Sequence, residues 1–131
     1  MKLRTILLGK WSWKRPLYSL ASIYLLLAAF AYFFADLIIF QPPPPSYGED
    51  LNQLRFIPDG RGGRIALIYD PPSPGQPTLL WSHGNAEDLG NIQPILNTLE
   101  DLGYGLLAYD YPGYGLSDGK PSEESVYRAA E

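Results

Sequence analysis

Residues 78–86 read TLLWSHGNA, an apolar run that breaks off at a histidine and a glycine. The run Thr78–Ser82 has the length of a strand that is buried on both faces of a sheet. The loop His83, Gly84, Asn85 and Ala86 follows it, and a glycine there lets the backbone pass close to a bound molecule. Backbone N–H groups between a strand and a helix point into a crevice, as an oxyanion hole requires. This stretch therefore predicts a strand that ends in a loop of backbone donors.

A helix is predicted directly after this loop. Apolar residues recur at helical spacing at Leu89, Ile92, Leu96 and Leu99. We expect Asn91 to cap the helix, Pro94 to lie in its tolerant first turn, and Gly103 to end it.

A second strand and a second helix complete the C-terminal part. Leu106–Tyr109 is a short apolar run, and the turn-rich residues 110–115 follow it. Ser122 is a candidate cap for a final helix that we expect to continue to Glu131. Strand, helix, strand and helix at this spacing predict a right-handed crossover in a parallel sheet, which places the domain in the α/β class.

An antiparallel hairpin is predicted before this unit. Leu54–Pro58 and Arg64–Asp70 mix apolar and polar residues, and the intervening residues 59–63 read DGRGG, which suits a loop with positive φ angles. Before the hairpin, residues 42–45 are four prolines, which favour an extended, semi-rigid spacer.

The N-terminal region has the pattern of a membrane anchor. Residues 17–40 are almost wholly apolar, and about 24 residues at 1.5 Å each exceed a hydrocarbon core of about 30 Å. Asp36 lies close enough to the end of this segment to reach the interface. Aromatic residues precede the span, as an interfacial belt would: Trp11, Trp13 and Tyr18. The predicted parts are a basic N-terminus (1–16), a transmembrane anchor (17–40), a proline-rich linker (41–53) and a partial soluble domain (54–131).

Charge predicts the orientation of this anchor. Residues 1–40 carry five of the chain's ten lysine and arginine residues but only one of its fourteen acidic residues. Basic residues before a span favour a cytoplasmic N-terminus, which puts the domain on the outer, periplasmic or extracytoplasmic face. The alternative is a cleaved signal peptide, because residues 29–31 (AFA) resemble a cleavage site, although apolar residues continue past it.

Composition narrows the possible partners and cofactors. The soluble part is acidic and would repel phosphate backbones, so we expect no nucleic-acid partner; we expect the lipid bilayer and a small acyl-type substrate. The chain has no cysteine and one histidine, which argues against a disulfide framework, a thiolate nucleophile and a zinc site. We expect no metal and no cofactor.

Two landmarks together resemble the α/β-hydrolase superfamily: residues 83–86 (HGNA) and residues 109–117 (YDYPGYGLS). With the anchor running into residues 40–43 (FQPP) and with residues 119–123 (GKPSE), the chain looks like the membrane-anchored subgroup related to protein depalmitoylases and serine aminopeptidase-like hydrolases. The resemblance implies acyl transfer by a serine, with the Asn85 N–H as one oxyanion donor. It also implies that the nucleophile, the triad acid and the catalytic histidine lie outside these 131 residues.

Ser117 is a candidate nucleophile by pattern alone. Residues 115–119 match G-x-S-x-G, but a nucleophile elbow needs its serine directly between a strand and a helix, so we interpret Ser117 as structural. The order His83, Asp110 and Ser117 matches a known triad order, but order does not identify a triad. We expect Asp110 to brace the glycine-rich loop, and Glu87-Asp88 to be a solvated helix cap.

The leading hypothesis is an N-terminal portion of a membrane-anchored serine hydrolase, acting on an ester, thioester or amide and inactive by itself. The nucleophile strand would continue the sheet beyond Glu131. One alternative is a membrane-tethered binding or interaction module without catalysis. Another is a hydrolase with an aspartate nucleophile, because these motifs belong to the fold and not to one nucleophile.

Overall fold

The computed structural model describes residues 13–130. The chain divides into two compact units, Met1–Ala35 and Asp36–Glu131. The elements in chain order are α2 (Lys14–Ile39), β1 (Leu54–Pro58), β2 (Arg64–Asp70), β3 (Thr78–Ser82), α3 (Leu89–Asp101), β4 (Gly105–Tyr109) and α4 (Glu123–Ala129).

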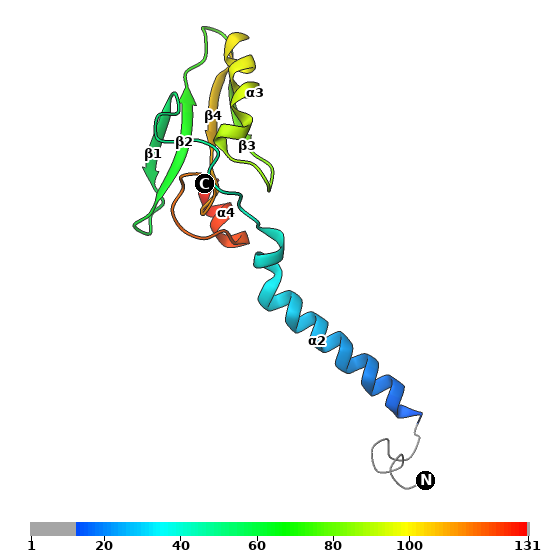
Figure 1. Ribbon diagram of the computed structural model, residues 1–131. Coiled ribbons are helices and arrows are strands. Elements are labelled where there is room, and N and C mark those ends of the chain that lie inside the picture. The colour runs from blue at the N-terminus through cyan, green and yellow to red at the C-terminus, as the bar shows by residue number, and fades with distance from the viewer. Residues whose placement is uncertain (1–12, 131) are drawn as a thin grey trace. The chain divides into compact units, whose positions relative to one another are not determined.

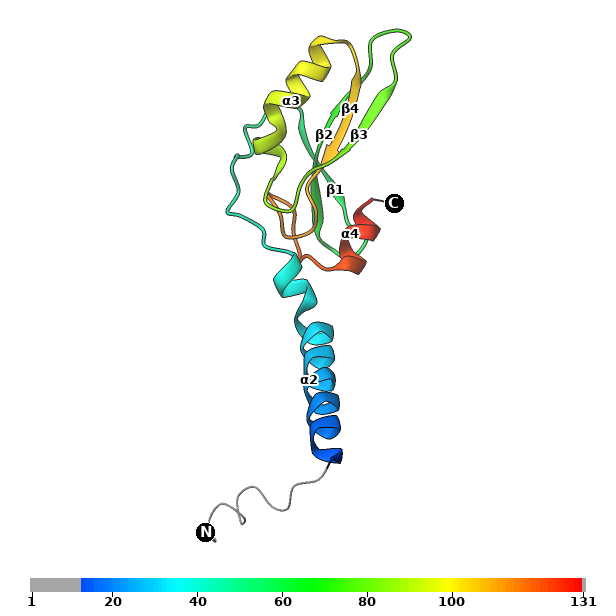
Figure 2. The same ribbon diagram turned by 90° about the vertical axis from the view of Figure 1, so that its right-hand side faces the viewer.

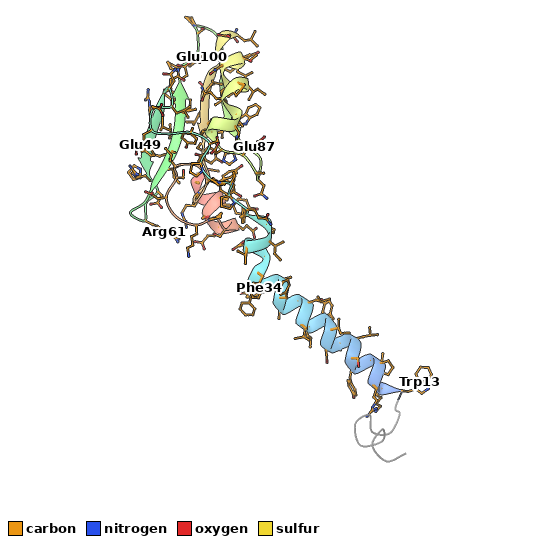
Figure 3. The ribbon with its side chains drawn as sticks, in the orientation of Figure 1. Trp13, Phe34, Glu49, Arg61, Glu87 and Glu100 are labelled. Carbon is orange, nitrogen blue, oxygen red and sulfur yellow. The ribbon has the colours of Figure 1, made fainter. Side chains whose placement is uncertain are left out.

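The N-terminal helix α2 is long and apolar enough to cross a membrane. It has 26 residues, its most apolar window has a mean hydropathy of 2.1, and none of that window is buried. The side chain of Phe34 projects outward from it, and Trp13, directly before the helix, is also exposed (Figure 3). The helix begins three residues before the predicted span 17–40, and a signal sequence would satisfy the same criteria of length and composition. Most of the predicted cationic N-terminus and Trp11 lie outside the described residues.

The domain is built on a mixed four-stranded sheet with the order β1-β2-β4-β3, shown in Figure 1. The predicted hairpin is confirmed with the same bounds, because β1 and β2 pair antiparallel. In its loop, Gly60 and Gly62 have positive φ angles, and Asp59 Oδ1 accepts hydrogen bonds from the N–H groups of Arg61 and Gly63. The parallel pairing of β3 with β4 confirms the predicted α/β unit.

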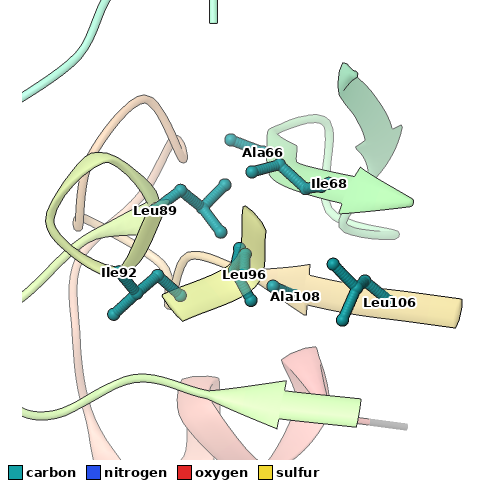
Figure 4. Packing of buried hydrophobic residues seen from close by; sticks show 7 residues of the cluster. All are labelled: Ala66, Ile68, Leu89, Ile92, Leu96, Leu106 and Ala108. Carbon is teal, nitrogen blue, oxygen red and sulfur yellow. The ribbon is translucent and has the colours of Figure 1, made fainter. Parts of the chain in front are cut away.

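The main core lies between α3 and the two central strands. Figure 4 shows that apolar side chains of α3 point toward alternate residues of β2 and β4; the cluster comprises Ala66, Ile68, Leu89, Ile92, Leu96, Leu106 and Ala108. The intervening strand residues face the other side, where Ile65, Leu67 and Tyr109 pack with Ala129 of α4. Helices α3 and α4 therefore lie on opposite sides of the sheet (Figure 2). Strand residues alternate between the two faces, so the two central strands, β2 and β4, supply both clusters.

Three details of α3 differ from the prediction. Asp88, and not Asn91, is the N-cap, and Asn91 completes a capping box with it. The helix consequently begins at Leu89, so Pro94 is its sixth residue and lies beyond the first turn. Asp88 is fully buried, which contradicts the predicted solvated cap, whereas Glu87 is exposed. A carboxylate can be buried here because several donors satisfy it.

The prediction that β3 is buried on both faces is wrong. Its residues alternate between exposed and half-buried, and Leu80 retains 60% of its accessible surface. The reason is its place in the sheet, since β3 is the edge strand and pairs only with β4 within the described residues. Helix α3 covers the face toward Leu79 and Trp81, but not the face of Leu80.

Helix α4 begins as predicted and ends earlier. Ser122 is its N-cap, with Glu123 and Glu124 in the first turn. The helix ends at Ala129, with Ala130 as its C-cap, and does not continue to Glu131, which lies outside the described residues.

Candidate functional site

The site loop, residues 83–86, joins the carboxyl end of β3 to α3. Gly84 to Glu87 forms a turn in which the Glu87 N–H donates to the Gly84 carbonyl at 3.2 Å. The Glu87 carboxylate accepts a hydrogen bond from the Gly84 N–H at 2.9 Å. Asn85 and Ala86 occupy the two central positions and are exposed. Within residues 13–130, no hydrogen bond occupies the Asn85 N–H.

The side chain of Asn85 fixes the loop. Its Nδ2 donates to the carbonyl of Ile39, and its Oδ1 accepts from the hydroxyl of the buried Tyr114. Both ends of the amide are therefore bonded to other residues of the unit Asp36–Glu131, whereas the backbone N–H has no hydrogen bond within residues 13–130. The sequence motif indicated the backbone donor but not this role of the side chain.

His83 is buried beneath the same loop. Its Nδ1 lies 2.8 Å from the Gly84 carbonyl, and since a carbonyl oxygen only accepts, the proton of this hydrogen bond is on Nδ1. The ring packs against Tyr111 at 4.3 Å between centroids, and the Tyr111 hydroxyl donates to the His83 carbonyl. His83 Nε2 lies 3.4 Å from Asp110 Oδ1 but makes no hydrogen bond within the described residues.

Asp110, at the end of β4, joins three separate segments. Its Oδ1 accepts from the Leu89 N–H at 2.9 Å, at the first turn of α3. Its Oδ2 accepts from the hydroxyl of Tyr47. Burial raises the pKa of this carboxyl, and the donors Tyr47 and Leu89 and the nearby His83 oppose that rise. A fully buried carboxyl with these partners links the start of α3 to the proline-rich segment.

Tyr47 and Ser46 show that the predicted linker is partly packed against the domain. Ser46 donates from both its N–H and its hydroxyl to the carboxylate of Asp88. The Tyr47 hydroxyl, besides donating to Asp110, accepts from the Leu116 N–H at 3.2 Å. Burial, and then the hydrogen bond to Asp110, raise the pKa of Tyr47. Neither residue was predicted to belong to the site, and the local signal in the sequence is an aromatic residue within a polar, proline-rich stretch.

The 110–117 loop closes tightly around Asp110. At Gly115, which has a φ of 47°, an added Cβ would lie 1.8 Å from Asp110 Oδ2. No side chain fits in that space, so glycine is required there by close approach as well as by backbone conformation.

The Ser117 side chain forms hydrogen bonds with two backbone groups. Its buried hydroxyl donates to the Asp110 carbonyl and accepts from the Ala66 N–H, both at 2.9 Å. These bonds connect the 110–117 loop to β2. The structure thus brings His83 and Asp110 together, but Ser117 joins them through the Asp110 carbonyl and not through the imidazole ring. Ser117 also lies in a loop, without the strand-turn-helix setting of a nucleophile elbow.

Two cavities lie away from the site loop. One, of about 150 Å³, is lined by residues of β1, β2 and α4, such as Arg128, and by Asp59 of the hairpin loop. The other, of about 300 Å³, is lined by residues that include Phe40 and Lys120. Neither has a lining residue from positions 83–86.

Comparison with known proteins gives relatives that are described as alpha/beta hydrolase domain-containing proteins. The chain is 46% identical over 69 residues to alpha/beta hydrolase domain-containing protein 17B of Xenopus tropicalis, covering 51% of this chain and 24% of the relative. It is 43% identical over 77 residues to alpha/beta hydrolase domain-containing protein aho-3 of Caenorhabditis elegans, covering 57% and 23%. The human protein 17B is 42% identical over 73 residues, covering 54% and 25%. The chain thus spans about a quarter of the length of these curated relatives.

The other comparisons add less. No protein-family model matches the chain. A solved structure of an alpha-beta hydrolase from Vibrio vulnificus aligns with a TM-score of 0.46 and 28% identity, over 60% of this chain and 26% of that chain.

Proposed function

Because this chain belongs to the α/β-hydrolase superfamily, we propose that it forms the oxyanion-hole wall of a membrane-anchored serine hydrolase. The observation that carries the proposal is the Asn85 N–H at the carboxyl end of β3, which has no hydrogen bond to any residue from 13 to 130. In open α/β sheets, ligands bind outside the carboxyl ends of the strands. The predicted substrates are esters, thioesters or amides. The sequence resemblance to the depalmitoylase-like subgroup agrees with substrates of this kind.

The chemistry follows from the geometry of the site loop. When a serine attacks a carbonyl carbon, the carbonyl oxygen becomes negative and needs preorganised donors. The direction of the Asn85 N–H is fixed in advance, because the Gly84 carbonyl of the same peptide unit accepts hydrogen bonds from His83 and Glu87. In this superfamily a second donor is the N–H of the residue after the nucleophile. The free edge of β3 is where we place the strand that carries that nucleophile.

Helix α2 serves as the anchor in this proposal, and the bilayer is its partner. Its length of about 39 Å, at 1.5 Å per residue, exceeds a hydrocarbon core of about 30 Å. With the N-terminus in the cytoplasm, the domain would face the outer side. Trypsin added to intact cells or spheroplasts should then cut at Arg64 or Arg128, which lie in the domain. Protection of both sites would contradict this orientation.

The proposed oxyanion donor is tested in a chimera. Residues 41–131 replace the matching segment of one of the curated relatives, and ester hydrolysis is measured. Asn85→Pro removes the N–H while suiting the second position of a turn, where proline is favoured. Loss of one oxyanion donor lowers kcat by about 10²- to 10³-fold. The matched control is Asn85→Ala, which keeps the N–H but removes the side-chain bonds. Equal kcat values for the two variants would contradict the proposed role.

A further inference from the structure

The peptide unit between Gly84 and Asn85 has its two polar ends in different environments. Its N–H, on Asn85, is the proposed oxyanion donor and is unoccupied within the described residues. Its carbonyl, on Gly84, lies 2.8 Å from His83 Nδ1 and 3.2 Å from the Glu87 N–H. Because a peptide unit is planar, groups that hold the carbonyl also fix the direction of the N–H. The position of the His83 ring therefore affects the direction of the Asn85 N–H.

His83 is itself held by a chain of contacts that leads to the linker. Its other nitrogen faces Asp110 Oδ1 at 3.4 Å, and Asp110 Oδ2 accepts from the Tyr47 hydroxyl. The Tyr47 oxygen accepts from the Leu116 N–H, so its own proton is directed to the carboxyl. The series runs from Tyr47 through Asp110 and His83 to the Gly84 carbonyl, and every member except that carbonyl is a side chain.

We propose that Tyr47, in the segment between the apolar helix and the sheet, is a positioning residue for the site loop: it holds Asp110, and through Asp110 and His83 it sets the Gly84–Asn85 peptide. This inference rests on the proposed role of the Asn85 N–H, and it adds that the linker is part of the site. Ser46, the neighbouring residue, has a different target, since its N–H and hydroxyl both donate to Asp88 at the cap of α3.

Loss of the Tyr47 hydroxyl has a specific structural consequence. Asp110 Oδ2 would lose its donor, and the Leu116 N–H would lose its acceptor. A buried carboxyl that loses a donor moves toward another one, because an unsatisfied buried acceptor is costly. The His83 ring is in close contact with the carboxyl, with 3.4 Å between Nε2 and Asp110 Oδ1, so we expect a change in the position of the carboxyl to displace the ring and the Gly84 carbonyl bonded to Nδ1. The phenyl ring of Tyr47→Phe still fills the space beside Gly90.

The test uses NMR of the full 131-residue chain in detergent micelles. Carbonyl-¹³C glycine combined with ¹⁵N asparagine gives a correlation only where glycine precedes asparagine, at Gly84–Asn85 and at Gly90–Asn91. The second peptide is an internal reference, because the Asn91 N–H donates to Asp88 and not to Asp110. The variant Asn91→Asp removes the Gly90–Asn91 peak, so the two peaks can be assigned.

We expect two opposite patterns of change. Tyr47→Phe should shift the Gly84–Asn85 peak and leave the Gly90–Asn91 peak in place. Ser46→Ala, the matched linker variant, should shift the Gly90–Asn91 peak, since Asp88 bonds both residues, and spare Gly84–Asn85. An unmoved Gly84–Asn85 peak in Tyr47→Phe, or an equal shift of that peak in Ser46→Ala, would overturn the proposal.

A second measurement needs no variant. His83 is the chain's only histidine, so its ¹⁵N-labelled imidazole gives an unambiguous spectrum. We expect a proton on Nδ1, as donation to the Gly84 carbonyl requires. An Nδ1 without a proton at neutral pH would break the series at its central step and refute the inference, whether or not Tyr47→Phe folds. Neither readout uses hydrolysis, so loss of the proposed function in the Asn85→Pro chimera would be a separate result.

Discussion

Replacing Tyr47 with phenylalanine should destabilise the domain by about 3 kcal/mol. The hydroxyl donates to the buried carboxyl of Asp110, and a hydrogen bond to such a group contributes about 2 kcal/mol. It also accepts from the Leu116 N–H, a neutral bond that contributes about 1 kcal/mol. The ring remains, so no cavity term is added.

Urea unfolding of the full chain in detergent micelles measures this loss. Trp81 packs against the core and reports on the domain once Trp11 and Trp13 are replaced by phenylalanine. The matched control is Tyr127→Phe, whose side chain is 65% exposed on α4 and whose loss should change stability by less than about 0.5 kcal/mol. If Tyr47→Phe costs no more than this control, the bonds to Asp110 and Leu116 do not contribute as argued.

The same variant has a defined dependence on pH. The pKa of Tyr47 is raised in the folded chain, first by burial and then by its bond to Asp110, whereas an unfolded tyrosine ionises near a pKa of about 10. The stability that Tyr47 contributes is therefore complete below pH of about 10 and is lost as pH rises toward the folded pKa. The difference between the wild-type chain and Tyr47→Phe should shrink above pH of about 10. A constant difference there would contradict the raised pKa.

Three further variants test the 110–117 loop and the edge strand. Gly115→Ala should unfold the domain or destabilise it strongly, because its Cβ would overlap Asp110 Oδ2. A non-glycine residue in a left-handed conformation by itself costs about 1 to 2 kcal/mol, and we expect a larger loss. Urea unfolding measures this loss, and a smaller effect would refute the argument. Ser117→Ala should cost about 2 kcal/mol in the same assay, since the Ala66 N–H loses its acceptor, and the wild-type chain should not react with a fluorophosphonate probe. Labelling that depends on Ser117 would show that it is a nucleophile. Leu80→Lys should change stability by less than about 0.5 kcal/mol, because this face of β3 is open; a larger loss would mean that the face is covered.

Local patterns were sufficient to predict the elements of the domain. The strand bounds Leu54–Pro58, Arg64–Asp70 and Thr78–Ser82 match the prediction, because apolar runs interrupted by glycine and proline mark strands without reference to the rest of the chain. The cap at Ser122 was predicted for a similar reason, since capping uses residues within three positions of each other. The site loop 83–86 was located by its place between a strand and a helix.

Polar contacts between distant segments were not predictable in this way. Tyr47 and Asp110 are separated by 63 positions, and Ser46 and Asp88 by 42, so no periodicity links them. Asn91 is an acceptable cap by residue type, but the structure caps α3 with Asp88, whose buried carboxylate accepts hydrogen bonds from Ser46 and from the Asn91 N–H.

The sequence by itself determined the apolar N-terminal segment, the order of strands and helices, and the place of the loop 83–86 between β3 and α3. These depend on spacing, turn residues and caps, which act over a few positions. Tertiary structure alone decided that β3 is a half-exposed edge, that the Ser117 hydroxyl bonds to backbone groups, and that Tyr47 bonds to Asp110. The physical reason is that burial and hydrogen-bond partners depend on which segments the folded chain brings together, and that information is spread over the whole sequence.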